Sequence, residues 1–71
     1  MGRYFIIALH GDGFSLYWNE KPTLVPMDQA MQYESLEKAD EALQLIPVFT
    51  DKNSKGEEYE LLPEILPVQI P

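Results

Sequence analysis

The stretch Gln29–Pro47 constrains the fold more than any other part of the chain, because it carries a complete set of helix signals. Ser35 can cap a helix by accepting a hydrogen bond from a first-turn amide, and Glu37 then places negative charge at the positive end of the helix dipole. An apolar stripe follows at helical spacing: Leu36, Ala39, Leu43 and Ile46. Pro47 cannot continue the helix. We predict a short leading strand, a helix capped at Ser35 and a stop at Pro47.

Two β-rich runs, Tyr4–His10 and Phe14–Trp18, flank the dipeptide Asp12-Gly13, which is a strong signal for a two-residue hairpin turn. In that register Leu9 faces Leu16, and the side-chain period of two assigns every residue to a face. The face expected to receive the helix carries Phe5, Ile7, Leu9, Leu16 and Trp18. The opposite face is too apolar for an ordinary solvated surface; it carries Tyr4, Ile6, Ala8, His10, Ser15 and Tyr17.

The remaining segments complete a small sheet. After a polar turn at Asn19–Pro22, Thr23–Met27 is a plausible third strand whose Pro26 suits an edge. Ala30–Tyr33 either returns to the sheet edge or runs as irregular chain. Glu57–Leu62 alternates like a last strand, and the proline-rich tail Pro63–Pro71 is extended and cannot be a central strand.

The fold class predicted from these elements is α+β, with a three- to four-stranded antiparallel sheet and one helix packed on one face. Residues 1–71 form a single small domain with an extended C-terminal segment, 63–71. The apolar residues of that segment should pack on their own domain, on a second copy or on a partner.

The net charge of the chain limits the kinds of molecule that it is expected to bind. Twelve acidic residues against five basic ones give a net charge of −7. This argues against direct binding to nucleic acids or anionic membranes, since both need positive charge, and it permits a partner protein with a basic surface. The alternative is that the acidity only aids solubility. The apolar run Phe5–Leu9 is too short for a membrane span or a signal core, and cysteines are absent, so a cytoplasmic protein is expected.

No catalytic, cofactor or metal motif stands out. His10 is the only imidazole, with no cysteine and no convincing serine partner, so neither a metal site nor a catalytic triad is expected. Gly11-Asp12-Gly13 leads into a strand rather than a helix and is not a phosphate loop. Asp51–Gly56 lacks the acidic third and fifth positions of a calcium loop. We therefore expect no enzyme activity and no cofactor.

The acidic residues form the main candidate surface. They lie on the solvent side of the predicted helix and in the base-free stretch that follows Gly56. The candidate partner-binding residues are Glu37, Asp40, Glu41, Glu57, Glu58, Glu60 and Glu64. The sequence thus predicts a small acidic protein-binding module. The alternative is a structural module that forms a homodimer through its C-terminal tail or through a sheet face carrying Tyr4, Ile6, Ala8 and Tyr17.

The run Trp18–Leu43 resembles a pattern in short phage and prophage proteins. In these, a hairpin that ends in an aromatic residue leads into the start of a helix, marked here by Ala30, Tyr33, Ser35 and Ala39. The resemblance implies a small ββ(β)αβ protein. It also implies a role like that of phage proteins that bind and inhibit host proteins in the host cytoplasm, a group that includes acidic nucleic-acid mimics and anti-CRISPR proteins.

Overall fold

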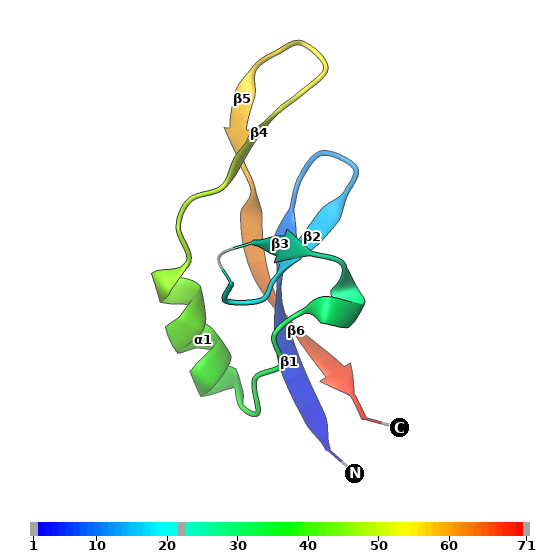
Figure 1. Ribbon diagram of the computed structural model, residues 1–71, viewed down its shortest axis with the longest axis vertical. Helices are drawn as coiled ribbons and strands as arrows, with labels where there is room; N and C mark the ends of the chain where they lie inside the picture. The colour runs from blue at the N-terminus through cyan, green and yellow to red at the C-terminus, as the bar shows by residue number, and fades with distance from the viewer. Residues whose placement is uncertain (1, 22, 71) are drawn as a thin grey trace.

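The computed structural model describes residues 2–21 and 23–70, so Pro22 of the predicted turn and Pro71 of the predicted tail lie outside the described residues. Four antiparallel strands form a sheet in the order β3-β2-β1-β6, and β4 and β5 form a separate two-stranded ribbon (Figure 1). The predicted α+β class, with one α-helix on an antiparallel sheet, is confirmed. The elements in chain order are β1 (Arg3–His10), β2 (Ser15–Trp18), β3 (Leu24–Val25), the 3-10 turn η1 (Met27–Gln29), α1 (Leu36–Leu45), β4 (Thr50–Lys52), β5 (Glu58–Glu60) and β6 (Leu62–Gln69).

The β1–β2 hairpin has the register that Asp12-Gly13 predicted. Leu9 lies opposite Leu16, with Ala8 opposite Tyr17 and His10 opposite Ser15. The amide of Gly11 donates to the carbonyl of Phe14 at 2.9 Å and closes the turn. Gly13 has a φ of 82°, in the left-handed region that glycine adopts without steric cost.

The helix begins and ends where its signals predicted. Ser35 has an extended backbone, and its Oγ accepts a hydrogen bond from the Lys38 amide at 3.1 Å. Ile46 leaves the helical region, with a ψ of 127°, because it precedes Pro47.

The packing stripe of α1 differs from the predicted one at its first member. Ala39 is fully buried, and Ala42, Leu43 and Ile46 pack against the core. Leu36, however, is 57% exposed, so its assignment to the buried stripe was wrong. Leu36 opens the first turn, whereas the helix meets the sheet through the later turns, where the small side chain of Ala39 permits close approach.

The core lies between α1 and the predicted face of the sheet. Its buried members are Ile7, Leu9, Trp18, Tyr33, Ala39 and Leu61, with Phe5 packed at the margin. Trp18 also stacks obliquely on Phe49, with ring centroids 6.0 Å apart. Leu16 is only half-buried and lies outside this core, contrary to expectation.

The segment before the helix pairs with the first half of β1, on the same edge where β2 pairs with the second half. The Met31 amide donates to the Trp18 carbonyl at 2.9 Å, where β2 ends. Tyr33 and Phe5 then exchange two backbone hydrogen bonds of 2.8 Å each. Of the two alternatives for Ala30–Tyr33, the return to the sheet edge holds at Tyr33, which forms an isolated bridge with Phe5, whereas residues 30–32 are irregular. The preceding turn, η1, contacts β2. In Figure 1 it lies to the right of β1 and β6, whereas α1 lies to their left.

The last strand is not where the sequence predicted it. Glu57–Leu62 supplies the short β5 and the first residue of β6, Leu62. Most of the proline-rich tail forms the rest of β6, which pairs with β1 from Arg3↔Gln69 to His10↔Leu62. The tail thus packs on its own domain. The prolines fit because β6 is an edge strand. The Ile70 amide donates to the Gly2 carbonyl, so the even-numbered residues of β6 form the hydrogen bonds to β1. Pro63 and Pro67 are odd-numbered, and their ring nitrogens therefore face the open edge, where no hydrogen bond is lost.

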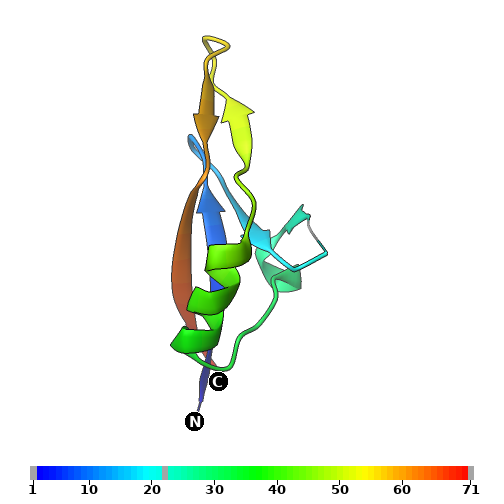
Figure 2. The same ribbon diagram turned by 90° about the vertical axis from the view of Figure 1, so that its left-hand side faces the viewer.

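The β4–β5 ribbon projects beyond the four-stranded sheet, which gives the molecule extents of 45 × 24 × 17 Å (Figures 1 and 2). Two contacts anchor it. The Leu61 amide donates to the Phe49 carbonyl at 2.8 Å, and the Asp12 amide donates to the Tyr59 hydroxyl at 2.9 Å.

Candidate functional site

The helix acids face solvent, as predicted. Glu37, Asp40 and Glu41 are all exposed on α1, opposite the buried Ala39. Asp40 accepts a hydrogen bond of 3.2 Å from the Gln44 side chain, an interaction of residues one turn apart.

The only lysine of the helix is already engaged. Lys38 forms an ion pair with Glu34, which precedes the helix. The hydrogen bond from Lys38 lowers the pKa of the Glu34 carboxyl, and the same bond raises the pKa of the Lys38 ammonium group. The positive charge of Lys38 therefore compensates the negative charges of Glu37, Asp40 and Glu41 only weakly.

The ribbon acids are also exposed. Glu57, Glu58 and Glu60 lie on or beside β5, with Glu58 opposite Lys52 in the register. Asn53 organises the turn: its Oδ1 accepts from the amides of Lys55 and Glu57 at 2.9 and 3.0 Å. The ribbon thus holds its carboxylates on a defined backbone away from the body of the protein.

The seventh candidate acid, Glu64, joins a chain of hydrogen bonds that sequence reasoning missed. Its Oε1 lies 2.7 Å from His10 Nε2, and His10 Nδ1 lies 2.7 Å from Ser15 Oγ. The expectation that His10 lacks a serine partner was therefore wrong. The hairpin register already placed Ser15 opposite His10, but Glu64 comes close only through the pairing of β6 with β1.

This Ser15–His10–Glu64 chain has the residue types of a nucleophilic triad without the surroundings of one. The side chains of His10 and Glu64 are 37% and 57% exposed, and neither described cavity is lined by any of the three residues. Acyl transfer needs a substrate pocket and donors aimed at the developing oxyanion. The visible role of the chain is to link β2, β1 and β6 across one face of the sheet.

The face considered for a homodimer is more enclosed than the sequence suggested. Ile6 and Ala8 are 2% and 0% exposed, so they have almost no surface to offer to a second molecule. Tyr4 and Tyr17 are half-buried. Leu62, which lies opposite His10 and hence on this face, is 67% exposed.

A strained residue lies next to the larger of the two described cavities. Glu20 has a φ of 66°, which is uncommon for a residue with a side chain. Its carboxylate accepts a hydrogen bond of 2.9 Å from the Tyr33 hydroxyl. Burial, followed by the contact with Glu20, raises the pKa of Tyr33. The bond fixes the Asn19–Lys21 loop to the core.

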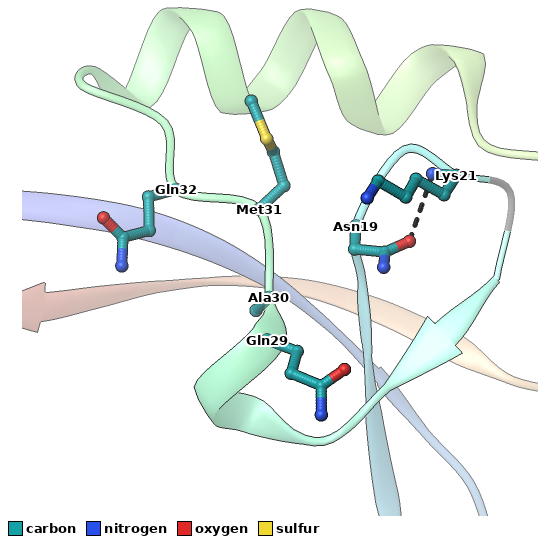
Figure 3. A pocket seen from close by; sticks show the side chains of 6 residues that line it. All are labelled: Asn19, Lys21, Gln29, Ala30, Met31 and Gln32. Atoms are coloured by element: carbon teal, nitrogen blue, oxygen red, sulfur yellow. Dashed lines mark hydrogen bonds between the residues drawn. The ribbon is translucent and has the colours of Figure 1, made fainter.

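The cavity beside this loop is wide, with a volume of about 550 Å3, and most of the side chains that line it are polar. Its lining consists of Asn19, Lys21, Gln29, Ala30, Met31 and Gln32 (Figure 3). Asn19 Oδ1 is occupied by the Lys21 amide and the Thr23 hydroxyl, at 3.1 and 3.2 Å. The free groups are amides and a single ammonium, which can form hydrogen bonds with a polar ligand but offer neither a nucleophile nor a carboxylate pair.

A second cavity lies where the end of α1 meets β5 and β6. It has a volume of about 220 Å3, and its lining is apolar except for Glu60. No local sequence signal could have revealed it, because three separate segments form its walls.

The search for other site types gives no candidate. Within residues 2–21 and 23–70, no group of three or more histidine, cysteine, aspartate or glutamate side chains is arranged to hold a metal ion. Over the same ranges, α1 is too short and too polar to cross a membrane. Comparison of the chain with protein-family models, with curated proteins and with solved structures finds no match.

Proposed function

We propose that this protein is a binding module that attaches to a basic surface of another protein through the acids of α1 and of the β5–β6 region. One observation carries the proposal. Among the described residues Lys38–Glu34 is the one ion pair between full charges, and Glu64 contacts His10, which is charged only when protonated. None of the other six candidate acids lies within ion-pair distance of a described basic side chain. These six are exposed carboxylates that form no ion pair within the described residues, and such charges steer association with a basic partner.

The resemblance of Trp18–Leu43 to short phage proteins gives the proposal a more specific form. The partner would be a host protein in the host cytoplasm, and binding would inhibit it. A basic groove that normally holds nucleic acid is the natural target, because exposed carboxylates can occupy the positions of phosphates there.

The test starts from a partner captured from host lysate, identified and purified. Its association rate with the wild type is compared with that of two double variants, Asp40→Lys/Glu41→Lys and Glu58→Lys/Glu60→Lys. A matched control, Asp12→Lys/Asp28→Lys, changes the net charge equally but lies outside the candidate surface.

We expect at least one candidate variant to slow association by about tenfold or more, with its melting temperature nearly unchanged. Raising the salt from about 0.1 M to about 1 M, which shortens the Debye length from about 10 Å to about 3 Å, should slow the wild type similarly. Equal effects of the control and both candidate variants, or binding indifferent to salt, would reject the acidic surface as the site.

A second candidate, self-association into a homodimer, is favoured by one observation: the 67% exposure of Leu62 on the sheet face opposite α1. Sedimentation from micromolar to millimolar protein, with Leu62→Ser as the comparison, tests it. A single monomer mass throughout for the wild type removes this candidate.

A further inference from the structure

The cavity at the end of α1 is a small apolar pocket with one charged group. Leu43 from α1, Ile46 at the C-terminal cap of the helix, Phe49 from the following segment and Leu61 from the β5–β6 junction supply apolar walls. These segments lie side by side in both views (Figures 1 and 2). Val48, which also lines the cavity, is 70% exposed.

The volume of about 220 Å3 sets the kind of occupant. Sites for cofactors and other small molecules span roughly 300–1,000 Å3, so this pocket is too small for them. It suits one large apolar side chain. Pockets that receive a single anchoring side chain are typical of the points that carry most of the binding energy in protein interfaces.

The charges around the pocket determine which kind of residue is favoured next to the inserted side chain in the partner. Glu60 is its only charged lining residue. Apart from Leu9 of β1, the residues that line the pocket lie in two stretches without any lysine or arginine, residues 39–51 and 56–70, whereas acids occur in both. A carboxylate beside an apolar pocket favours a cation next to the inserted side chain and disfavours an anion there.

We propose that this pocket binds a large apolar or aromatic side chain that has an arginine or lysine next to it in a partner protein. The inference rests on the proposed function and gives the acidic surface its anchoring point. A second copy of this chain is a poorer occupant, because two molecules of net charge −7 repel each other.

Methyl and amide NMR spectra of the full chain test the proposal with three blocked peptides: acetyl-Gly-Phe-Arg-Gly-amide, acetyl-Gly-Phe-Glu-Gly-amide and acetyl-Gly-Ala-Arg-Gly-amide. The Phe-Arg peptide should shift the methyl signals of Leu43, Ile46 and Val48 in a saturable way, and it should bind at least about fivefold more tightly than either other peptide. Glu60→Gln should weaken its binding by about two- to fivefold, as loss of an exposed charge pair does. Asp28→Asn, which removes the charge of an exposed acid outside the candidate surface, should not.

Three results would overturn the pocket assignment. Shifts confined to the acids, with the pocket methyl groups silent, would leave the acidic surface standing and reject the pocket. Equal binding of the Phe-Glu peptide would reject the requirement for a cation. Pocket signals that move with protein concentration alone would assign the pocket to a second copy. Failure of the proposed function is a separate result, because it appears as salt-independent binding of the captured partner.

Discussion

Replacing Trp18 with alanine should remove a large share of the stability of this domain. Trp18 is 7% exposed, joins the core on the helix side of the sheet and packs on Phe49. Truncating a buried tryptophan to alanine costs about 3–5 kcal/mol. At about 0.05–0.15 kcal/mol per residue, a chain of 71 residues has a total stability of roughly 4–11 kcal/mol. The substitution should therefore remove between about a quarter of that stability and all of it.

The measurement has to avoid fluorescence, because Trp18 is the only tryptophan of the chain. Urea unfolding followed by far-ultraviolet circular dichroism gives the free energy of unfolding directly. In a thermal scan, about 4–8 °C per kcal/mol for a domain of this size predicts a fall of at least about 12 °C.

Tyr17→Ala is the matched control, since Tyr17 is the neighbouring residue on the opposite face and is half-buried. It should cost about 1–2 kcal/mol, in proportion to the smaller apolar area that it buries. If Trp18→Ala melts within a few degrees of the wild type, or Tyr17→Ala costs more than Trp18→Ala, the assignment of the two sheet faces is wrong.

Three further predictions concern the cap, the buried tyrosine and the edge strand. Ser35→Ala should lower the free energy of unfolding by about 1 kcal/mol, measured in urea, because the Lys38 amide loses its acceptor. Tyr33→Phe should lower the free energy of unfolding by about 1 kcal/mol at pH 7, because the hydrogen bond from the Tyr33 hydroxyl to Glu20 is lost. The folded state raises the pKa of Tyr33, so the stability that the hydroxyl contributes is complete below the unfolded pKa of about 10 and is lost as the pH rises above it. The cost of the substitution should therefore be smaller in urea titrations at about pH 11. Pro63→Val/Pro67→Val should restore amide donors at the open edge of β6 and raise the aggregation rate seen by light scattering, whereas unchanged scattering would show that this edge is protected in another way.

Local signals in the sequence were enough for the hairpin and the helix. Asp12-Gly13 fixes the turn, so the pairing of β1 with β2 follows from backbone geometry. Ser35 and Pro47 likewise mark the two ends of α1 through hydrogen bonding and sterics within a few residues. Leu36 was misplaced because helical periodicity states which side chains share a stripe but not how much of that stripe the sheet covers.

The position of β6 in the sheet could not be predicted from its own residues. Pro63 and Pro67 argue against a strand when each is considered alone, yet their spacing of four sends both ring nitrogens to the same edge. Only the pairing with β1, more than fifty residues away in sequence, makes that edge the open one. The same pairing brings Glu64 to His10, which is why the hydrogen-bonded chain with Ser15 was missed.

The exposure of the acids was predictable, because charged residues on the far side of a helix stripe and on alternating strand positions have no core to enter. The pocket beside Glu60 was not, because its walls come from Leu9 of β1, from the end of α1 with the segment that contains Val48, and from Leu61 at the β5–β6 junction. Those walls meet only after the helix has packed on the sheet and the ribbon has turned away from it.

The edges of the two sheets bear on how this protein can recognise a partner. Adding a strand to a sheet requires a row of free amide and carbonyl groups on an exposed edge. At the open edge of β6, Pro63 and Pro67 supply no amide donor, and β3, at the other end of the sheet, spans only two residues. The four-stranded sheet therefore offers little for backbone pairing. On the proposal made above, recognition of a partner therefore comes from side chains, and the acids of α1 together with the pocket beside Glu60 are the proposed contacts.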